Sequence, residues 1–322
     1  MPVAPALAVI VCAYTEDRWE RIVAAVDSIA GQTRPADEVI LVIDHNDALR
    51  ARASAQSWSA RVIANDDAQG LSGARNSGVR ASSAQVVAFL DDDAVADPDW
   101  LAHLAAPYAE PNVVGVGGRI DPVWATRRPT WWPPEFDWVV GCTYRGMPER
   151  TSDVRNPIGA NMSFRRSAVL EAGGFDATTG RGRGRPMGGE ETELSIRIAQ
   201  RSPGSRIVYE PSATVAHHVP ARRATVRYFV ERCYAEGLSK AGVARLAGRD
   251  RGLASERRYL TRTLPVAAGR DVVAGVVRLR PHRLAQALAI ATGVLVTTAG
   301  YVVGIATGLR TSSDALAGRD QG

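Results

Sequence analysis

The chain has 322 residues, of which 45% are hydrophobic and 23% charged, the balance of an ordinary globular protein. Its net charge of +5 comes from arginines that form no recognisable nucleic-acid motif, so a nucleic-acid partner is not predicted. The spacing of Cys12, Cys142 and Cys233 fits neither a metal site nor a disulfide framework, which favours a reducing compartment. No secretory signal is expected, because residues 1–8 lack a basic segment.

The first ninety residues predict alternating strands and helices. Short runs rich in β-branched residues predict strands over residues 7–13, 38–43, 61–64 and 86–90. Helical spacing of apolar residues, or a glycine-led start, predicts helices over residues 19–30 and 70–81. This alternation is typical of a mostly parallel sheet covered by helices, in which ligands bind at the carboxyl ends of the strands.

Two later segments differ in composition. Residues 120–150 carry four tryptophans and several prolines, which predicts a long irregular loop that forms either an acceptor-side wall or ordinary packing. Residues 284–309 contain no charged residue over 26 positions, a length that can span a bilayer. Seven arginines between Arg257 and Arg283 precede it and favour a cytosolic catalytic side and contact with anionic lipid. The alternative is a buried hairpin of two core helices.

These changes predict four parts of the chain. A catalytic domain covers residues 1–225 and a basic helical linker residues 226–283. A membrane-associating segment covers residues 284–309, and a frayed tail residues 310–322. The predicted location is the cytoplasmic face of the cell membrane, with the protein either peripheral or spanning once.

Three consecutive aspartates, Asp91, Asp92 and Asp93, follow the predicted strand 86–90. Carboxylates at positions i and i+2 of an extended segment lie on one side of it and can converge on one hard cation. Mg²⁺ and Mn²⁺ take oxygen ligands and typically share them with substrate phosphates. The tripeptide therefore indicates a metal and diphosphate site, with a solvated acidic turn as the alternative.

Further motifs carry chemistry along the chain. The glycine-rich residues 70–78 lie at the start of a predicted helix, and a helix N-terminus favours phosphate. Two glutamates, Glu190 and Glu191, follow two glycines at another predicted helix start, where acidic residues are also ordinary partners of the helix dipole. Downstream, His217 and His218 offer an imidazole that can join carboxylates on a metal ion, and His217 is favoured.

The order of these motifs over residues 7–240 resembles the family 2 glycosyltransferases. The resemblance implies an α/β fold: a single-domain nucleotide-sugar-binding fold with a mixed, mostly parallel sheet flanked by helices, here followed by a C-terminal helical, membrane-associating segment. It implies contacts with the donor nucleotide and sugar from Glu16, Asp44, Gly73, Arg75, Asn76, Asp91, Asp92, Gly159 and Asn161. It implies Mn²⁺ or Mg²⁺ bound by Asp93, Asp91 and His217.

The resemblance also implies the reaction. An inverting transferase moves one sugar from a nucleoside diphosphate sugar, by default a UDP-sugar, to a hydroxyl of a glycan, lipid-linked or small-molecule acceptor. Glu191 occupies the position of the general base and Glu190 that of an acceptor contact. The family has an aspartate in this pair, so which glutamate acts as the base stays open. The Gln-x-x-Arg-Trp motif of processive synthases is absent, which favours a single transfer.

The donor prediction goes one step further. Residues 142–197 are similar to a branch of the family that moves glucuronate onto lipid-linked glucose. Arg181, Arg183 and Arg185 precede the acidic pair, and guanidinium groups suit carboxylates or phosphates. This predicts UDP-glucuronate as the donor, with a solvated loop as the alternative for the arginines.

Two other functions compete with this one. A sugar-1-phosphate nucleotidyltransferase has a glycine-rich phosphate loop after the first strand, whereas residues 14–18 here are acidic and lack glycine. A non-catalytic nucleotide-sugar-binding protein is the other alternative, and the retained aspartates and glutamates oppose it. Hydrolysis of a donor with metal added or chelated separates these possibilities.

Overall fold

The computed structural model describes residues 5–176, 189–247 and 259–307 of the chain. Contacts among them divide the chain into two compact units. The first contains the described parts of residues 1–121, 148–183 and 190–218, and the second contains the remainder. Residues 122–147 thus group with the C-terminal helices, while the domain boundaries predicted above stay predictions.

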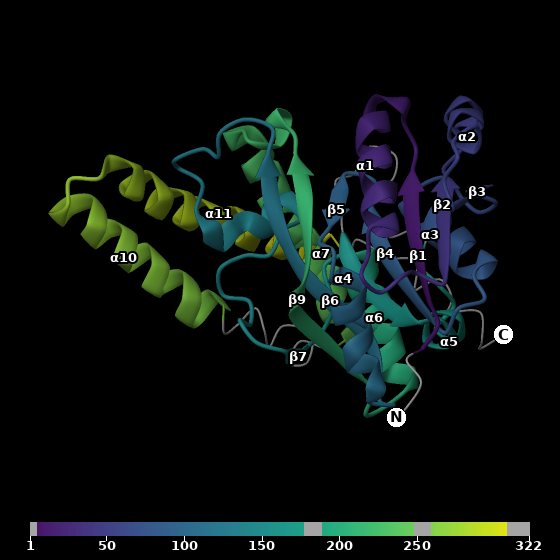
Figure 1. The fold of residues 1–322 in the computed structure, drawn as a ribbon. Helices are drawn as coiled ribbons and strands as arrows, with labels where there is room; N and C mark the ends of the chain where they lie inside the picture. Colours follow the sequence, from purple (N-terminus) through teal and green to yellow (C-terminus); the bar gives the residue numbers. More distant parts are fainter. Residues whose placement is uncertain (1–4, 177–188, 248–258, 308–322) are drawn as a thin grey trace. The chain divides into compact units, whose positions relative to one another are not determined.

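Among the described residues, one nine-stranded sheet forms the framework of the first unit, in the order β3-β2-β1-β4-β8-β6-β9-β5, with β7 paired to β9 (Figure 1). Strand β1 pairs in parallel with β2 and β4, and β2 with β3, whereas β8 runs antiparallel to β4 and β6. The strands are β1 Leu7–Ala13, β2 Glu38–Ile43, β3 Arg61–Ala64, β4 Val86–Asp91, β5 Ala94–Ala96, β6 Val113–Trp124, β7 Ser152–Val154, β8 Asn161–Arg165 and β9 Arg206–Val219.

Helices flank this sheet. They are α1 Trp19–Ala30, α2 Asp47–Ser54, α3 Leu71–Ala81, α4 Trp100–Ala105, α5 Arg166–Glu171 and α6 Glu190–Arg201. Helix α1 forms because Ile22, Val26 and Ile29 recur at helical spacing and are buried together. The predicted strands and helices of the first ninety residues are confirmed. Helix α2 was not predicted, although Asn46 caps it by accepting a hydrogen bond from the Leu49 N–H at 2.9 Å.

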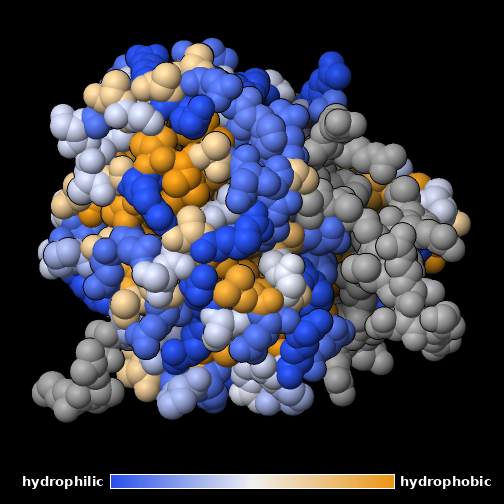
Figure 2. Space-filling view, turned by 90° about the vertical axis from the view of Figure 1, so that its right-hand side faces the viewer, coloured by the Kyte–Doolittle hydropathy of each residue, from blue (hydrophilic) through white to orange (hydrophobic). Residues whose placement is uncertain are grey.

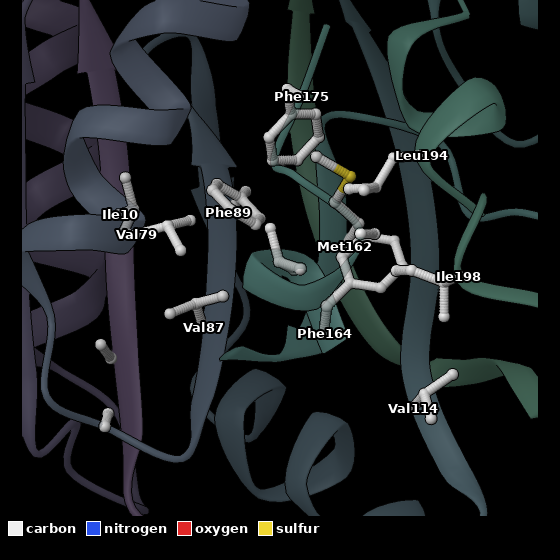
Figure 3. Packing of buried hydrophobic residues seen from close by; sticks show 14 of the residues in the cluster. Ile10, Val79, Val87, Phe89, Val114, Met162, Phe164, Phe175, Leu194 and Ile198 are labelled. Atoms are coloured by element: carbon white, nitrogen blue, oxygen red, sulfur yellow. The ribbon is translucent and has the colours of Figure 1, made fainter. Parts of the chain in front are cut away.

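The hydrophobic core of the first unit lies between the sheet and helices α3 and α6. Residues from β1, β4 and β8 meet there with residues from these helices (Figure 3). The rings of Phe89 and Phe175 pack edge to face with centroids 5.3 Å apart. Phe89 lies two residues before Asp91, so this packing fixes the end of β4 from which the three aspartates emerge.

The second unit contains α7 Val226–Ala247, α10 Leu264–Val277 and α11 Pro281–Ala306, together with the 3-10 helix η3 Pro134–Val140. Trp132 is fully buried and packs edge to face on Phe229 of α7, with ring centroids 5.3 Å apart. The prediction of an irregular loop over residues 120–150 is therefore wrong in part. Trp124 ends a strand, η3 is helical, and Trp132 belongs to a core because burial of its ring outweighs exposure to a ligand.

Helices α7 and α11 approach each other very closely. A Cβ atom added at Gly237 would lie 2.1 Å from the Thr297 carbonyl oxygen, and one added at Gly300 would lie 2.2 Å from the Tyr234 carbonyl oxygen. Only glycine therefore allows this contact between the two backbones. The buried face of α11 is fixed to α7, so removal of α11 would expose the packed side of α7.

Helix α11 is long and apolar enough to cross a membrane by length and composition. Only 22% of its most apolar window is buried, so the alternative of a core hairpin is not what the described residues form. Leu288, Leu295 and Val302 are 69%, 71% and 58% exposed and follow one another at seven-residue spacing. They form one apolar stripe along the helix, opposite its contact with α7.

Other exposed apolar residues fall into two kinds: a group on α10 (Val266, Val272, Val273, Val276 and Val277) and single side chains elsewhere. On the face shown in Figure 2, hydrophilic residues surround separate apolar areas. Isolated exposed apolar side chains are normal on protein surfaces and need no partner. The stripe on α11 differs from these isolated side chains because its members are aligned.

Candidate active site

The carboxyl ends of the parallel strands lie at one edge of the sheet. Cys12 of β1 pairs in register with Asp91 of β4, and Ala13 pairs with Ile43 of β2, which precedes Asp44. Asp44 and Asp91 therefore leave neighbouring strands on the same edge. This is where parallel sheets of this kind bind ligands.

Asp91, Asp93 and His217 form a group whose ligand atoms all lie within 4.8 Å of one another. The histidine belongs to β9. The pairing of β9 with β5 places it next to the aspartates, because Ala94 pairs in register with His217. The Asp93 Oδ1 and His217 Nε2 atoms are 3.2 Å apart. Adjacent ligands of an octahedral Mg²⁺-sized ion, each at about 2.1 Å, are separated by about 3 Å. The donor set and its spacing thus fit Mn²⁺ or Mg²⁺.

Asp92 has a different partner. Its Oδ1 accepts a hydrogen bond of 2.6 Å from Nη1 of Arg18, and the same nitrogen lies 3.2 Å from Oδ2 of Asp93. Burial raises the pKa of Asp92 to about 7, against the opposing effect of the Arg18 charge. Among the described residues, Asp92 is outside the candidate metal group.

Arg75 of α3 connects the metal group to the acidic pair. Its side chain is 2% exposed and donates to Oε1 of Glu190 and to the Gly159 carbonyl, both at 3.1 Å. It also lies 3.5 Å from Oδ1 of Asp91. Burial alone would lower the pKa of Arg75, but the carboxylates of Glu190 and Asp91 outweigh it and raise that pKa. Arg75 is therefore a permanent cation among these carboxylates.

The two glutamates at the start of α6 have different surroundings. The Glu190 side chain is 8% exposed and held by Arg75. Glu191 is half-buried, and its Oε2 lies 3.8 Å from the place where a Cβ on Gly159 would be. The same Cβ would approach Nη2 of Arg75 to 3.1 Å. Glycine at 159 thus keeps open the space between Arg75 and the more accessible glutamate.

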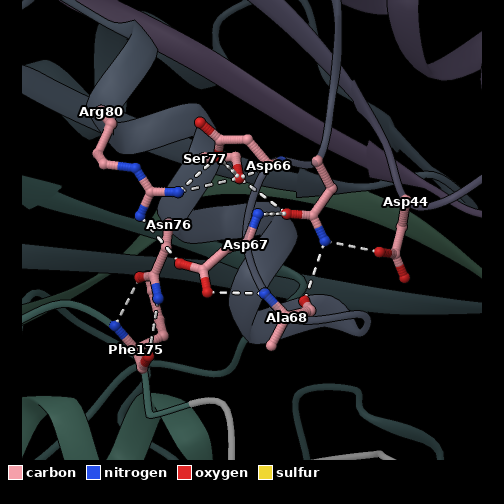
Figure 4. A network of polar contacts seen from close by, with 9 residues as sticks. Asp44, Asp66, Asp67, Ala68, Asn76, Ser77, Arg80 and Phe175 are labelled. Atoms are coloured by element: carbon pink, nitrogen blue, oxygen red, sulfur yellow. Dashed lines mark hydrogen bonds and ion pairs between the residues drawn. The ribbon is translucent and has the colours of Figure 1, made fainter.

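Asp44 holds the loop that leads into α3 (Figure 4). Its Oδ1 accepts from Nδ2 of Asn65 at 2.6 Å, and its Oδ2 accepts from the Gly70 N–H at 3.0 Å. A carboxylate has about four lone-pair sites, so these bonds leave acceptor capacity for a nucleotide base. A base contact at Asp44 stays a prediction, as does one at Glu16, which is exposed in the turn Glu16–Arg18.

Two other residues predicted to contact the donor, Gly73 and Asn76, make close contacts within the protein. A Cβ at Gly73 would lie 1.9 Å from the Ala68 carbonyl oxygen, so this glycine is required by the preceding loop. The Asn76 side chain donates to the Phe175 carbonyl at 2.9 Å and accepts from the Phe175 N–H at 2.7 Å (Figure 4). Both residues position the segments around Arg75, and a contact of either with the donor stays a prediction.

Asn161 is also committed to the fold. It is fully buried, donates to the Arg119 and Ala213 carbonyls at 2.8 Å each, and accepts from the Trp100 indole at 2.8 Å. The amide therefore satisfies three buried partners from two strands and a helix. A close approach of Asn161 to the donor sugar stays a prediction. Gly159 lies beside Arg75 and Glu191.

Sequence reasoning missed Arg18 as a site residue. It lies between Asp92 and Asp93, although it is more than seventy positions away in the chain. Its only sequence signal is its place in the loop after β1, whose neighbour Glu16 was already predicted to face the nucleotide. Arg181, Arg183 and Arg185 lie outside the described residues.

Comparisons with known proteins place this geometry in context. The pattern described as Glycosyl transferase family 2 matches residues 8–173. The chain is 36% identical over 238 residues to the Glucosyl-dolichyl phosphate glucuronosyltransferase of Haloferax volcanii, an alignment that covers 73% of this chain and 76% of that protein.

Solved structures share the fold. The mannosyltransferase PcManGT of Pyrobaculum calidifontis, in complex with GDP-Man and Mn²⁺, matches with a TM-score of 0.57 at 19% identity and covers 91% of this chain and 87% of its own. GalNAc-T7 with UDP, GalNAc and Mn²⁺ matches with a TM-score of 0.54 at 17% identity, over 75% and 51% of the two chains. The matched pattern and the relative together show that this chain belongs to glycosyl transferase family 2 and is a glycosyltransferase.

Proposed function

We propose that this glycosyltransferase moves one glucuronate from UDP-glucuronate to a hydroxyl of a lipid-linked sugar, with inversion at the anomeric carbon. The observation that carries the transfer chemistry is that the buried Arg75 contacts both Asp91, a member of the candidate metal group, and Glu190 of the acidic pair. The printed function of the Haloferax volcanii relative supports the choice of donor and acceptor.

Asp91, Asp93 and His217 would hold the divalent cation, Mn²⁺ or Mg²⁺. When bound, such a cation stabilises the departing diphosphate as a Lewis acid. Both similar structures contain Mn²⁺, which supports this assignment. Arg75 fixes the orientation of Asp91 from the protein side, at 3.5 Å.

Glu191 takes the proton of the attacking hydroxyl in this proposal. It is the more accessible of the two glutamates and faces the open position at Gly159. Glu190 is engaged by Arg75 at 3.1 Å, so in this proposal its role is to position the acceptor. A single base without a second nucleophile gives inversion, because the hydroxyl attacks the face opposite the leaving diphosphate.

The competing functions have less support. A sugar-1-phosphate nucleotidyltransferase is disfavoured by the family match over residues 8–173 and by the acidic turn Glu16–Arg18 after β1. A non-catalytic binding protein would have no need for a half-buried glutamate beside a glycine at the metal edge.

A panel of UDP- and GDP-sugars tests the donor. We expect the purified protein to prefer UDP-glucuronate to UDP-glucose, because an arginine contact with the sugar carboxylate is typically worth about 1.5–3 kcal/mol. Replacing Arg181, Arg183 and Arg185 one at a time with glutamine should shrink the preference at the residue that makes this contact, and Arg50→Gln on α2 serves as a control of equal charge loss. Equal use of the two donors by the wild type would remove the basis for this assignment.

The apolar stripe on α11 should bring the protein to the cytoplasmic face of a membrane, where a lipid-linked acceptor lies. The variant with Leu288, Leu295 and Val302 all changed to glutamine keeps the buried face of α11 against α7 and removes only the exposed stripe. We expect the wild type to float with vesicles that contain anionic lipid, because Arg278, Arg280 and Arg283 lie at the start of α11. The triple variant should remain at the bottom of the gradient.

The control for this experiment is Leu170→Gln, which removes an exposed apolar side chain outside α11. Extraction with alkaline carbonate then separates peripheral attachment, which it reverses, from a true span. A wild-type protein that stays soluble and does not float would contradict membrane association and would point to a soluble acceptor.

A further inference from the structure

The two carboxylate oxygens of Asp93 have different partners. Oδ1 lies 3.2 Å from Nε2 of His217, and Oδ2 lies 3.2 Å from Nη1 of Arg18. Oδ1 therefore faces the candidate metal group, while Oδ2 faces a guanidinium cation. Asp93 is buried, so solvent does not compete strongly for either oxygen.

Two further contacts hold Arg18 in this position. Nη1 donates to Oδ1 of the buried Asp92 at 2.6 Å, a short charge-assisted hydrogen bond. The guanidinium lies over the ring of Tyr14, 5.3 Å from its centroid. The Arg18 side chain is only 13% exposed. Moving Arg18 away from Asp93 would leave the buried Asp92 without this partner, which is costly.

This arrangement restricts how Asp93 can bind a metal ion. Ca²⁺ takes six to eight oxygen ligands and commonly uses both oxygens of a carboxylate. Mg²⁺-sized ions require an octahedral shell, in which one oxygen from each carboxylate suffices. With Oδ2 engaged by Arg18, Asp93 can offer only Oδ1.

We propose that Arg18 is a selectivity residue for the metal: by engaging Oδ2 of Asp93 it enforces one-oxygen coordination and favours Mn²⁺ or Mg²⁺ over Ca²⁺. This inference rests on the metal site of the proposed function. Arg18 would determine the metal selectivity without being one of the metal ligands. Arg18 acts through Asp93 and is thus a positioning residue.

The ratio of Ca²⁺ to Mn²⁺ dissociation constants isolates this effect. Both ions carry two charges, so removal of the Arg18 charge strengthens or weakens their attraction to the site by a similar amount. Only the change in coordination geometry affects the two ions differently. A general loss of structure would weaken the binding of both ions and leave the ratio of their dissociation constants almost unchanged.

Binding is measured by the loss of the free Mn²⁺ signal in electron paramagnetic resonance, with Ca²⁺ as competitor, in the presence and absence of UDP. The full-length wild type is compared with Arg18→Gln, with Arg18→Lys and with the control Arg50→Gln, which removes an exposed arginine from α2. We expect Arg18→Gln to lower the Ca²⁺/Mn²⁺ ratio by roughly 10-fold, the effect typical of a partner of a metal ligand. Arg18→Lys should retain most of the wild-type ratio, and Arg50→Gln all of it.

Other results of this experiment would overturn either the role of Arg18 or the metal site. Mn²⁺ binding with an unchanged ratio in Arg18→Gln would overturn the inference and leave the proposed function intact. A wild type that binds neither ion, even with UDP, would overturn the metal site itself. If Arg18→Gln does not fold, Asp92→Asn provides the test, because it keeps the shape of the side chain and releases Arg18 from its anchor. It should lower the ratio in the same direction, and an unchanged ratio in this variant would overturn the inference.

Discussion

Asp93→Ala is expected to abolish sugar transfer, with a loss on the order of 10³-fold or more. The side chain supplies the oxygen that lies 3.2 Å from His217 Nε2 in the candidate metal group. Without it the site loses a charged ligand, and a bound metal typically contributes several kcal/mol of transition-state stabilisation, with about 1.4 kcal/mol for each factor of ten in rate. Transfer rates and the Mn²⁺ dependence of UDP binding by calorimetry measure the effect.

Two companion variants make this result specific. Asp93→Asn keeps the shape of the side chain and should lose nearly as much activity, which separates loss of charge from a cavity. Asp97→Ala removes an exposed aspartate four positions along the chain and should leave transfer unchanged. Undiminished activity in Asp93→Ala would show that the metal group is assigned to the wrong residues.

Glu191→Gln is expected to slow transfer by roughly 10²–10⁴-fold while donor binding survives. Glutamine has the shape of glutamate but cannot take a proton from the acceptor hydroxyl. Because glutamine keeps the size of the side chain, the melting temperature of this variant is measured as the check that its fold is intact. Single-turnover rates together with UDP-sugar binding provide the comparison.

Glu190→Gln should behave differently. It weakens the partner of an arginine that is 2% exposed, and a buried charge that loses its partner is strongly destabilising. We therefore expect a lower melting temperature and weaker donor binding, with a smaller effect on the chemical step. If Glu190→Gln keeps its stability and slows single-turnover transfer more than Glu191→Gln, the roles of the two glutamates are reversed.

The sequence predicted the local parts of this site well, because strand ends and helix starts have local signals. The run that ends at Asp91 and the glycines before α3 mark such places. The contacts between distant residues could not be predicted. Arg75 meets Glu190 across 115 positions, and only the packing of α3 against the sheet brings them together.

Some of the predicted donor contacts stay predictions for a different reason. A motif indicates that a residue type is needed, but it does not show whether a ligand or the protein itself uses that residue. Asn161 has the amide that a sugar hydroxyl would suit, yet the carbonyls of Arg119 and Ala213 take both of its donors. His217 shows the opposite case: the pairing of β5 with β9 decides that its ring meets Asp93.

The position of Arg75 makes the two ends of the site thermodynamically coupled. One cation lies 3.5 Å from Asp91 on the metal side and 3.1 Å from Glu190 on the acceptor side. Neutralising the carboxylate of Asp91 or of Glu190 strengthens the interaction of Arg75 with the other one. The free-energy effects of substituting the two residues are therefore not additive. In the proposed mechanism, metal affinity and acceptor positioning are therefore linked quantities, because both depend on the charge of Arg75.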